Sequence, residues 1–205
     1  MGDRTGVLGG TFDPPHRAHL ELAAAAREQL ELSNVIFMPA GNPWRKSQGE
    51  VSSAAVRLEM VAAAVQNIGW ATVSDMEALN PGPTYTAETL KRLKAEDPER
   101  NLWFILGADA LLDMAYWHNP REIVRCARLA VAARNGAEPR AGNELVRLIP
   151  EVQSFIDPIS MGAFPDSSTS YRQRIGDTGF LGSEQDAAEA VLEIIRREGV
   201  YGNAD

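Results

Sequence analysis

Short apolar runs recur along the chain and predict the strands of a buried sheet. Each of the strongest runs is continuous rather than alternating, which is typical of parallel strands covered by helices on both faces. These runs are residues 6–8, 35–38, 102–106 and 129–133, and residues 71–74 and 153–157 are weaker candidates. The pattern therefore predicts up to six strands.

Between the strands, apolar residues recur with helical spacing. One stripe consists of Leu58, Val61, Ala62 and Val65, and a second of Ala187, Ala190, Val191, Ile194 and Ile195. The Ala- and Leu-rich residues 18–32 favour a helix by propensity. Alternating strands and helices imply right-handed crossovers and an α/β, doubly wound parallel sheet. Ligands bind such sheets beyond the carboxyl ends of the strands, so the segments that follow the strands are the candidate site.

Length and charge limit the classes of function. A chain of 205 residues suffices for a single domain over residues 1–205 with a sizeable core. Its net charge of -8 opposes binding to nucleic acid or an anionic membrane. Neither a run of about 20 apolar residues nor a signal-peptide pattern occurs, which predicts a cytoplasmic protein. The one cysteine, Cys126, lies in an apolar stretch and is expected to be a buried structural residue.

The stretch GVLGGTFDPPHRAHL, residues 6–20, carries the strongest chemical signal. Gly9 and Gly10 follow the first strand and are expected to adopt backbone conformations closed to other residues, so that a ligand can approach. The stretch matches neither the P-loop motif nor the dinucleotide-binding fingerprint. A helix is expected to begin near Arg17, which places His16 and His19 at its first turn, beside exposed backbone N–H groups.

This arrangement predicts a phosphate site made of imidazoles and backbone amides. Two alternatives are a structural histidine pair and a metal site completed by His118 or by a distant carboxylate.

The segment GGTFDPPHRAH resembles the G-G-T/S-F-D/N-P-x-H-x-G-H signature of the nucleotidylyltransferase superfamily, with Ala18 in place of the last glycine. The chain as a whole resembles the bacterial nicotinate-nucleotide adenylyltransferases. The resemblance implies a Rossmann-like nucleotidyltransferase fold and two catalytic residues, His16 and His19. It also implies that ATP lies against four consecutive residues, Gly9, Gly10, Thr11 and Phe12.

By the same resemblance, two later segments also contact ATP. In GADALLDMAYWHNP, residues 107–120, Gly107 and Asp109 lie beside the nucleotide. In DSSTSYRQR, residues 166–174, Ser168 or Thr169 caps a helix whose free N–H groups bind the β- and γ-phosphates together with Arg172, the third catalytic residue.

The resemblance assigns a further group of residues to the mononucleotide substrate. They are Lys46 in the loop PAGNPWRK, the hydroxyl-bearing Thr84, Tyr85 and Thr86 at the nicotinate pocket, Trp117 stacking on the pyridine ring, and Arg134 near the substrate phosphate. Three structural alternatives remain open. The Lys46 loop could be merely solvated, Thr84 or Thr86 could cap a helix that Glu88 closes, and Trp117 could be a core residue.

The reaction implied is adenylyl transfer from ATP to nicotinate mononucleotide, which gives nicotinate adenine dinucleotide and pyrophosphate in NAD biosynthesis. Mg²⁺ would enter with ATP, and no metal held by the protein alone is expected. The implied partners are these small molecules, without nucleic acid or membrane, and a homodimer is permitted. The alternatives are transfer to nicotinamide mononucleotide or to phosphopantetheine, and a nucleotide-binding sensor without turnover.

Overall fold

The computed structural model describes residues 3–41, 51–133, 138–162, 168–169, 171–172 and 189–202. The chain divides into two compact units, and each is treated by itself. The first unit consists of Met1–Gly9, Leu22–Ile36 and Thr84–Ala163, and the second of Gly10–Glu21, Phe37–Pro83 and Phe164–Asp205. The single domain expected from the length stays a prediction.

The elements alternate between strands and helices, as the apolar pattern predicts. In chain order they are β1 (Arg4–Gly10), α1 (Arg17–Gln29), β2 (Asn34–Pro39), α2 (Ala54–Val65), β3 (Ala71–Val73), α3 (Thr86–Glu96), β4 (Asn101–Gly107), α4 (Ala108–Asp113), η1 (Met114–Tyr116), α5 (Pro120–Cys126), β5 (Ala127–Ala132), α6 (Asn143–Leu148), η2 (Val152–Phe155), β6 (Ile156–Ile159) and α8 (Glu189–Glu198). No helix in these described parts is long and apolar enough to cross a membrane.

The strands form one six-stranded sheet in the order β3-β2-β1-β4-β5-β6. The pairings of β1 with β4, β4 with β5 and β5 with β6 are parallel. Strand order therefore reverses after β1, as in doubly wound sheets. This confirms the predicted α/β fold class.

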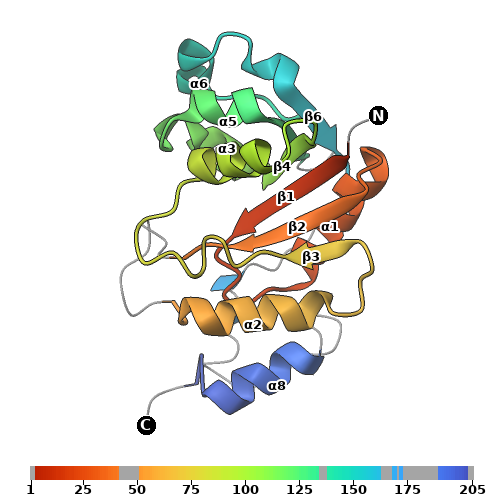
Figure 1. Ribbon diagram of the computed structural model, residues 1–205, viewed down its shortest axis with the longest axis vertical. Helices are drawn as coiled ribbons and strands as arrows, with labels where there is room; N and C mark the ends of the chain where they lie inside the picture. Colours follow the sequence, from red (N-terminus) through yellow and green to blue (C-terminus); the bar gives the residue numbers. More distant parts are fainter. Residues whose placement is uncertain are drawn as a thin grey trace. The chain divides into compact units, whose positions relative to one another are not determined.

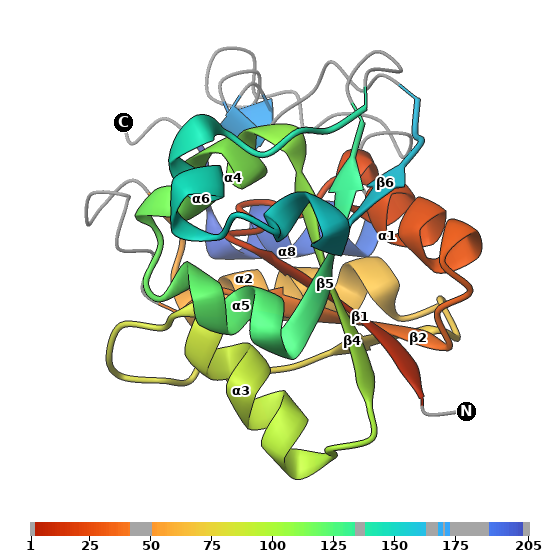
Figure 2. The same cartoon turned by 90° about the horizontal axis from the view of Figure 1, so that it is seen from above.

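Continuous burial explains why the strands of the first unit read as unbroken apolar runs. One row of paired residues crosses four neighbouring strands and consists of Val7, Phe104, Leu129 and Ile156. All four are buried. In the same unit α3 lies beside α5, and β4 beside β5 (Figure 2). Cys126, at the end of α5, is a free and buried thiol, as expected.

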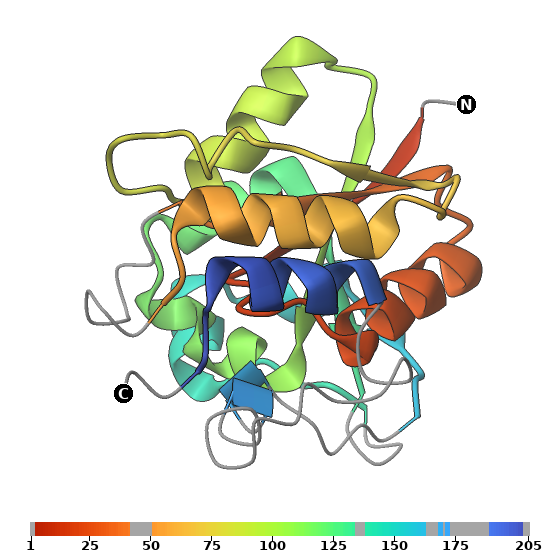
Figure 3. The ribbon, with the colours of Figure 1, turned by 90° about the horizontal axis from the view of Figure 1, so that it is seen from below.

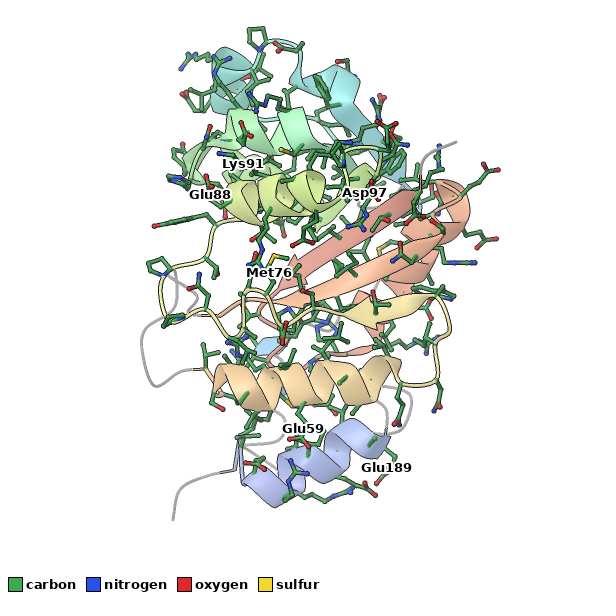
Figure 4. The ribbon with its side chains drawn as sticks, viewed as in Figure 1. Glu59, Met76, Glu88, Lys91, Asp97 and Glu189 are labelled. Atoms are coloured by element: carbon green, nitrogen blue, oxygen red, sulfur yellow. The ribbon has the colours of Figure 1, made fainter. Side chains whose placement is uncertain are left out.

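In the second unit α2 and α8 run side by side (Figures 1 and 3). Their shared core contains Met60 of α2 and Val191, Ile194 and Ile195 of α8. Glu59 projects from α2 on the side of α8 (Figure 4), where its Oε2 lies 2.5 Å from Nη2 of Arg197. The predicted stripe of α8 is confirmed at its three aliphatic positions, and Ala187 lies outside the described residues.

Three details of the sequence prediction are wrong. The expected stripe of α2 is displaced, because Ala62 is exposed whereas Arg57 and Met60 are buried. Helix α1 ends at Gln29 rather than at residue 32. Most of the strand predicted at residues 153–157 is the 3-10 turn η2, and β6 follows it. Pro158 is tolerated in β6 because this strand lies at the edge of the sheet.

A polar ladder crosses the strands of the first unit beside this core. The Asp157 carboxylate accepts hydrogen bonds from Arg128 at 2.7 Å and from the Trp103 indole at 2.8 Å. The guanidinium of Arg4 lies 4.5 Å above the Trp103 ring. Burial alone would raise the pKa of Asp157. The hydrogen bonds from Arg128 and Trp103, with the positive charges of Arg128 and Arg4, outweigh this effect and lower the pKa below its usual value.

Replacing Asp157 by asparagine is expected to lower the free energy of unfolding at neutral pH by about 1–2 kcal/mol. Because the folded-state pKa lies below the unfolded value, the carboxylate contributes fully above pH 3.8 and progressively less as pH falls through the folded-state pKa. Urea unfolding at a series of pH values measures this. The difference between wild type and variant should shrink on acidification, and a pH-independent difference would contradict the account.

Candidate phosphate and pyridine sites

The turn after β1 is shaped by a phenylalanine rather than by glycines. Gly9 and Gly10 belong to the strand, whereas Phe12 has a φ of 51° in the left-handed region, which is rare for a bulky residue. The expectation that the two glycines supply unusual backbone conformations is therefore wrong. Because they lack a side chain, the two glycines leave room for neighbouring aromatic rings instead. A Cβ on Gly10 would lie 3.2 Å from the Phe12 ring, and one on Gly9 would lie 3.3 Å from the Phe104 ring.

Phe12 is fully buried and supports the histidine pair. Its ring lies edge-on to the His19 ring, with the centroids 4.9 Å apart. The ring centroids of His16 and His19 are 3.9 Å apart, at an interplanar angle of 40°. Helix α1 begins at Arg17, as predicted, and the N–H of His19 donates to the carbonyl of His16 at 2.9 Å. The two imidazoles therefore lie together at the first turn of α1.

The geometry fixes the protonation state of His19. Its Nδ1 accepts a hydrogen bond from the backbone N–H of His16 at 3.2 Å. Burial, with a smaller effect of neighbouring His16, lowers the pKa of His19 to about 3. The ring is therefore neutral at physiological pH and carries its hydrogen on Nε2. His19 is therefore a directed neutral donor rather than a cation.

The late Ser/Thr motif lies against the same loop in the second unit. Ser168 donates from Oγ to the carbonyl of Pro14 at 3.2 Å, across 154 residues of sequence. Arg172 donates from Nη1 to the carbonyl of Asp13 at 2.6 Å, and Thr169 Oγ1 lies 3.5 Å from its Nη2. These contacts engage two of the five N–H donors of the guanidinium. The unit thus brings Arg172 to the loop that carries the two histidines.

A buried arginine that the sequence analysis missed stabilises this loop. Arg57 of α2 is 1% exposed and donates to three carbonyls, those of Ser52 at 3.0 Å, Thr11 at 2.8 Å and Gly41 at 2.7 Å. It joins the signature loop to the chain just after β2 and to the chain just before α2. The sequence did carry a signal for its burial, because the helical spacing of residue 57 with Met60 and Val61 places all three on one face of α2.

The residues predicted for the pyridine pocket lie in the first unit, in two segments that contact each other. Tyr85, just before α3, stacks on His118 with ring centroids 4.3 Å apart at 30°. The neighbouring Trp117 lies edge-to-face with Phe104 of β4, with centroids 6.0 Å apart at 79°. Trp117 is half-buried, so it is not a fully enclosed core residue. The structure thus brings Tyr85 and Trp117 into adjoining aromatic pairs.

The capping alternative for the segment before α3 is wrong. The residue at the N-cap is Tyr85, and its side chain makes no capping hydrogen bond. The carbonyl of Tyr85 accepts from the backbone N–H of Glu88 at 2.9 Å instead. The hydroxyls of Thr84 and Thr86 flank this position on half-buried residues.

Gly107 and Asp109 lie where β4 passes into α4, in the first unit. Among the described residues, no atom beyond the chain neighbours of Gly107 lies within 4 Å of the place that a Cβ on it would occupy, so the backbone there faces open space. Asp109 is exposed in the first turn of α4. This combination suits the close approach of a ligand to the backbone.

Two predicted substrate residues, Lys46 and Arg134, lie outside the described residues. In the parts that are described, no three His, Cys, Asp or Glu side chains gather as metal ligands would. The expected absence of a metal held by the protein alone stays a prediction, and a homodimer stays only permitted.

Comparisons with known proteins agree with the fold class and with the family resemblance found in the sequence. Residues 7–174 match the model of the cytidylyltransferase-like family. A Dehalococcoides mccartyi protein named "probable nicotinate-nucleotide adenylyltransferase" is 39% identical over 199 residues, 97% of each chain. A Chromobacterium violaceum protein of the same name is 36% identical over 219 residues, which cover 98% of this chain and 100% of the relative.

Among solved structures, nicotinic acid mononucleotide adenylyltransferase of Plasmodium falciparum, complexed with NaAD, superposes with a TM-score of 0.76 over 97% of both chains. At 16% identity this likeness supports the fold alone. The extent of the sequence matches, together with the signature at residues 9–19, shows that the chain belongs to the nicotinate-nucleotide adenylyltransferase family of cytidylyltransferase-like proteins.

Proposed function

We propose that this chain transfers the adenylyl group of ATP to nicotinate mononucleotide. A phosphate oxygen of the mononucleotide attacks the α-phosphorus, the bond to the β-phosphate oxygen breaks, and pyrophosphate leaves with its electron pair. The products are nicotinate adenine dinucleotide and pyrophosphate. One observation carries the proposal: His16, His19 and Arg172 converge on one loop although Arg172 is distant in sequence.

This group of residues suits phosphoryl chemistry that needs no general base. The attacking phosphate is already ionised at neutral pH, so positioning and charge stabilisation provide the catalysis. His19 donates from Nε2 to an oxygen of the α-phosphate, His16 contacts the neighbouring phosphates, and Arg172 stabilises the leaving pyrophosphate. A neutral imidazole can be partly buried without the cost of desolvating a charge, which suits the half-buried His19 as a donor.

The remaining motif residues bind the rest of the two substrates. The backbone of Gly9 to Phe12, the late Ser168 and Thr169, and the segment with Gly107 and Asp109 contact ATP. Thr84, Tyr85 and Thr86 border the nicotinate ring and its carboxylate, and Trp117 stacks on the ring. Lys46 and Arg134 supply positive charge to the mononucleotide. Mg²⁺ enters as part of the ATP substrate and neutralises phosphate charge.

Replacing Trp117 by alanine is expected to raise the KM for nicotinate mononucleotide about tenfold or more and to leave the KM for ATP within about twofold, because a stacked ring is worth ~1–3 kcal/mol. Steady-state kinetics with each substrate varied in turn measure this. Tyr116→Ala, at the exposed neighbouring residue, is the control and should change neither constant. Equal effects on both substrates would contradict the stacking role.

Pyrophosphate release tests the proposed function. The purified protein is incubated with MgATP and one acceptor at a time: nicotinate mononucleotide, nicotinamide mononucleotide or phosphopantetheine. Fastest release with nicotinate mononucleotide supports the proposal. Faster release with either other acceptor reassigns the substrate, and no release with any acceptor indicates a nucleotide-binding protein without turnover.

A further inference from the structure

A fully buried carboxylate lies in the signature loop, two residues after Thr11. Asp13 is 0% exposed, so its charge requires compensation by polar partners. The backbone N–H of Ser52 lies 3.3 and 3.4 Å from its two oxygens. Nη1 of Arg172 lies 3.8 Å from Oδ2, and the same Nη1 donates to the Asp13 carbonyl. Asp13 therefore contacts Arg172 with both its carboxylate and its backbone carbonyl.

The closest side-chain partner of Asp13 comes from the far end of the chain. The hydroxyl of Tyr201 donates to Oδ1 of Asp13 at 2.5 Å, across 188 residues of sequence. Burial, and next the hydrogen bond to Asp13, raise the pKa of Tyr201 above its usual value. The phenol consequently remains protonated and acts as a donor throughout the physiological range.

Tyr201 has an unfavourable backbone conformation that its side-chain contacts hold in place. Tyr201 has a φ of 67°, in the left-handed region that is costly for a residue with a Cβ. Such a conformation persists only where surrounding contacts hold it. Here the ring packs against the core shared by α2 and α8, and the hydroxyl reaches Asp13.

We propose that Tyr201 is a positioning residue for ATP binding: it fixes the Asp13 carboxylate and, through it, the guanidinium of Arg172. The segment after α8 thus sets the geometry of the signature loop from outside the motif. This inference rests on the proposed function, in which Arg172 contacts the β- and γ-phosphates. A misplaced guanidinium would weaken binding of ATP and leave binding of the mononucleotide unchanged.

Tyr201→Phe is the direct test, because it removes the hydroxyl and keeps the ring in its apolar contacts. We expect the KM for ATP to rise about five- to thirtyfold and the KM for nicotinate mononucleotide to stay within about twofold. Tyr116→Phe, at an exposed tyrosine, is the matched control and should behave as wild type. All assays are run well below the melting temperature of each variant, so that loss of folded protein does not enter the constants.

A double-mutant cycle separates positioning from a merely structural role. If Tyr201 acts through Arg172, Tyr201→Phe should change the KM for ATP by less than about twofold in an Arg172→Ala background. Additive effects, equal effects on both substrates, or a lowered melting temperature with an unchanged KM for ATP would overturn the inference. Wild-type turnover is measured first, since its absence would refute the proposed function itself rather than the role of Tyr201.

Discussion

Replacing His19 by alanine is expected to leave the fold intact and to lower kcat by about 10²–10³-fold, the usual cost of losing one transition-state donor. The reason lies in the orientation of the ring. His16 holds Nδ1 through its backbone N–H, so the donor hydrogen is on Nε2. With its pKa lowered to about 3, His19 of the free protein does not titrate near neutral pH, and no change of kcat/KM with pH in that region should depend on it.

His19→Gln separates a neutral donor from a cation. Glutamine carries an N–H donor without charge and should recover about tenfold of the loss caused by alanine. Arg17→Ala is the control in the same helical turn, because that side chain is exposed and pairs with Glu21. Single-turnover rates, with melting temperatures measured in parallel, test these expectations. Near-normal turnover in His19→Ala would show that His19 takes no part in the chemical step.

Replacing Arg57 by methionine is expected to lower the free energy of unfolding by about 3–5 kcal/mol. Methionine fills much of the same space but leaves the carbonyls of Thr11, Gly41 and Ser52 without their guanidinium donors. It also removes the positive charge that faces Asp13. Urea unfolding measures the loss, with the m-value checked for a change in the denatured state.

The control for Arg57 is Arg92→Met in α3. Arg92 is exposed and forms an ion pair with Glu96 one turn away, so its loss should cost at most about 0.5 kcal/mol. A loss below about 1 kcal/mol for Arg57→Met would show that water replaces the guanidinium at these carbonyls.

Most of the fold could be predicted from the sequence because parallel strands buried on both faces leave continuous apolar runs. The runs at Val7, Phe104 and Leu129 all became paired strands. The prediction failed at a charged residue that is buried and at an apolar segment that forms a turn. Arg57 is no part of the predicted stripe of α2, yet its side chain is buried there, and the chain before β6 forms a turn that apolar content alone does not distinguish from a strand.

The site could be predicted as a set of motifs but not as a network. The signature named His16 and His19, yet the neutral state of His19 depends on burial, which its sequence neighbours do not reveal. The contacts of Asp13 with Arg172 and Tyr201 join residues more than 150 positions apart, and no local spacing encodes them. These long-range contacts decide how the motif residues are oriented.

A crystal structure with a non-hydrolysable ATP analogue and nicotinate mononucleotide tests the central claim most directly. The account predicts a phosphate oxygen within hydrogen-bond distance of Nε2 of His19, with the Arg172 guanidinium on the terminal phosphates. A nucleotide bound elsewhere, with no phosphate near either His16 or His19, would contradict it.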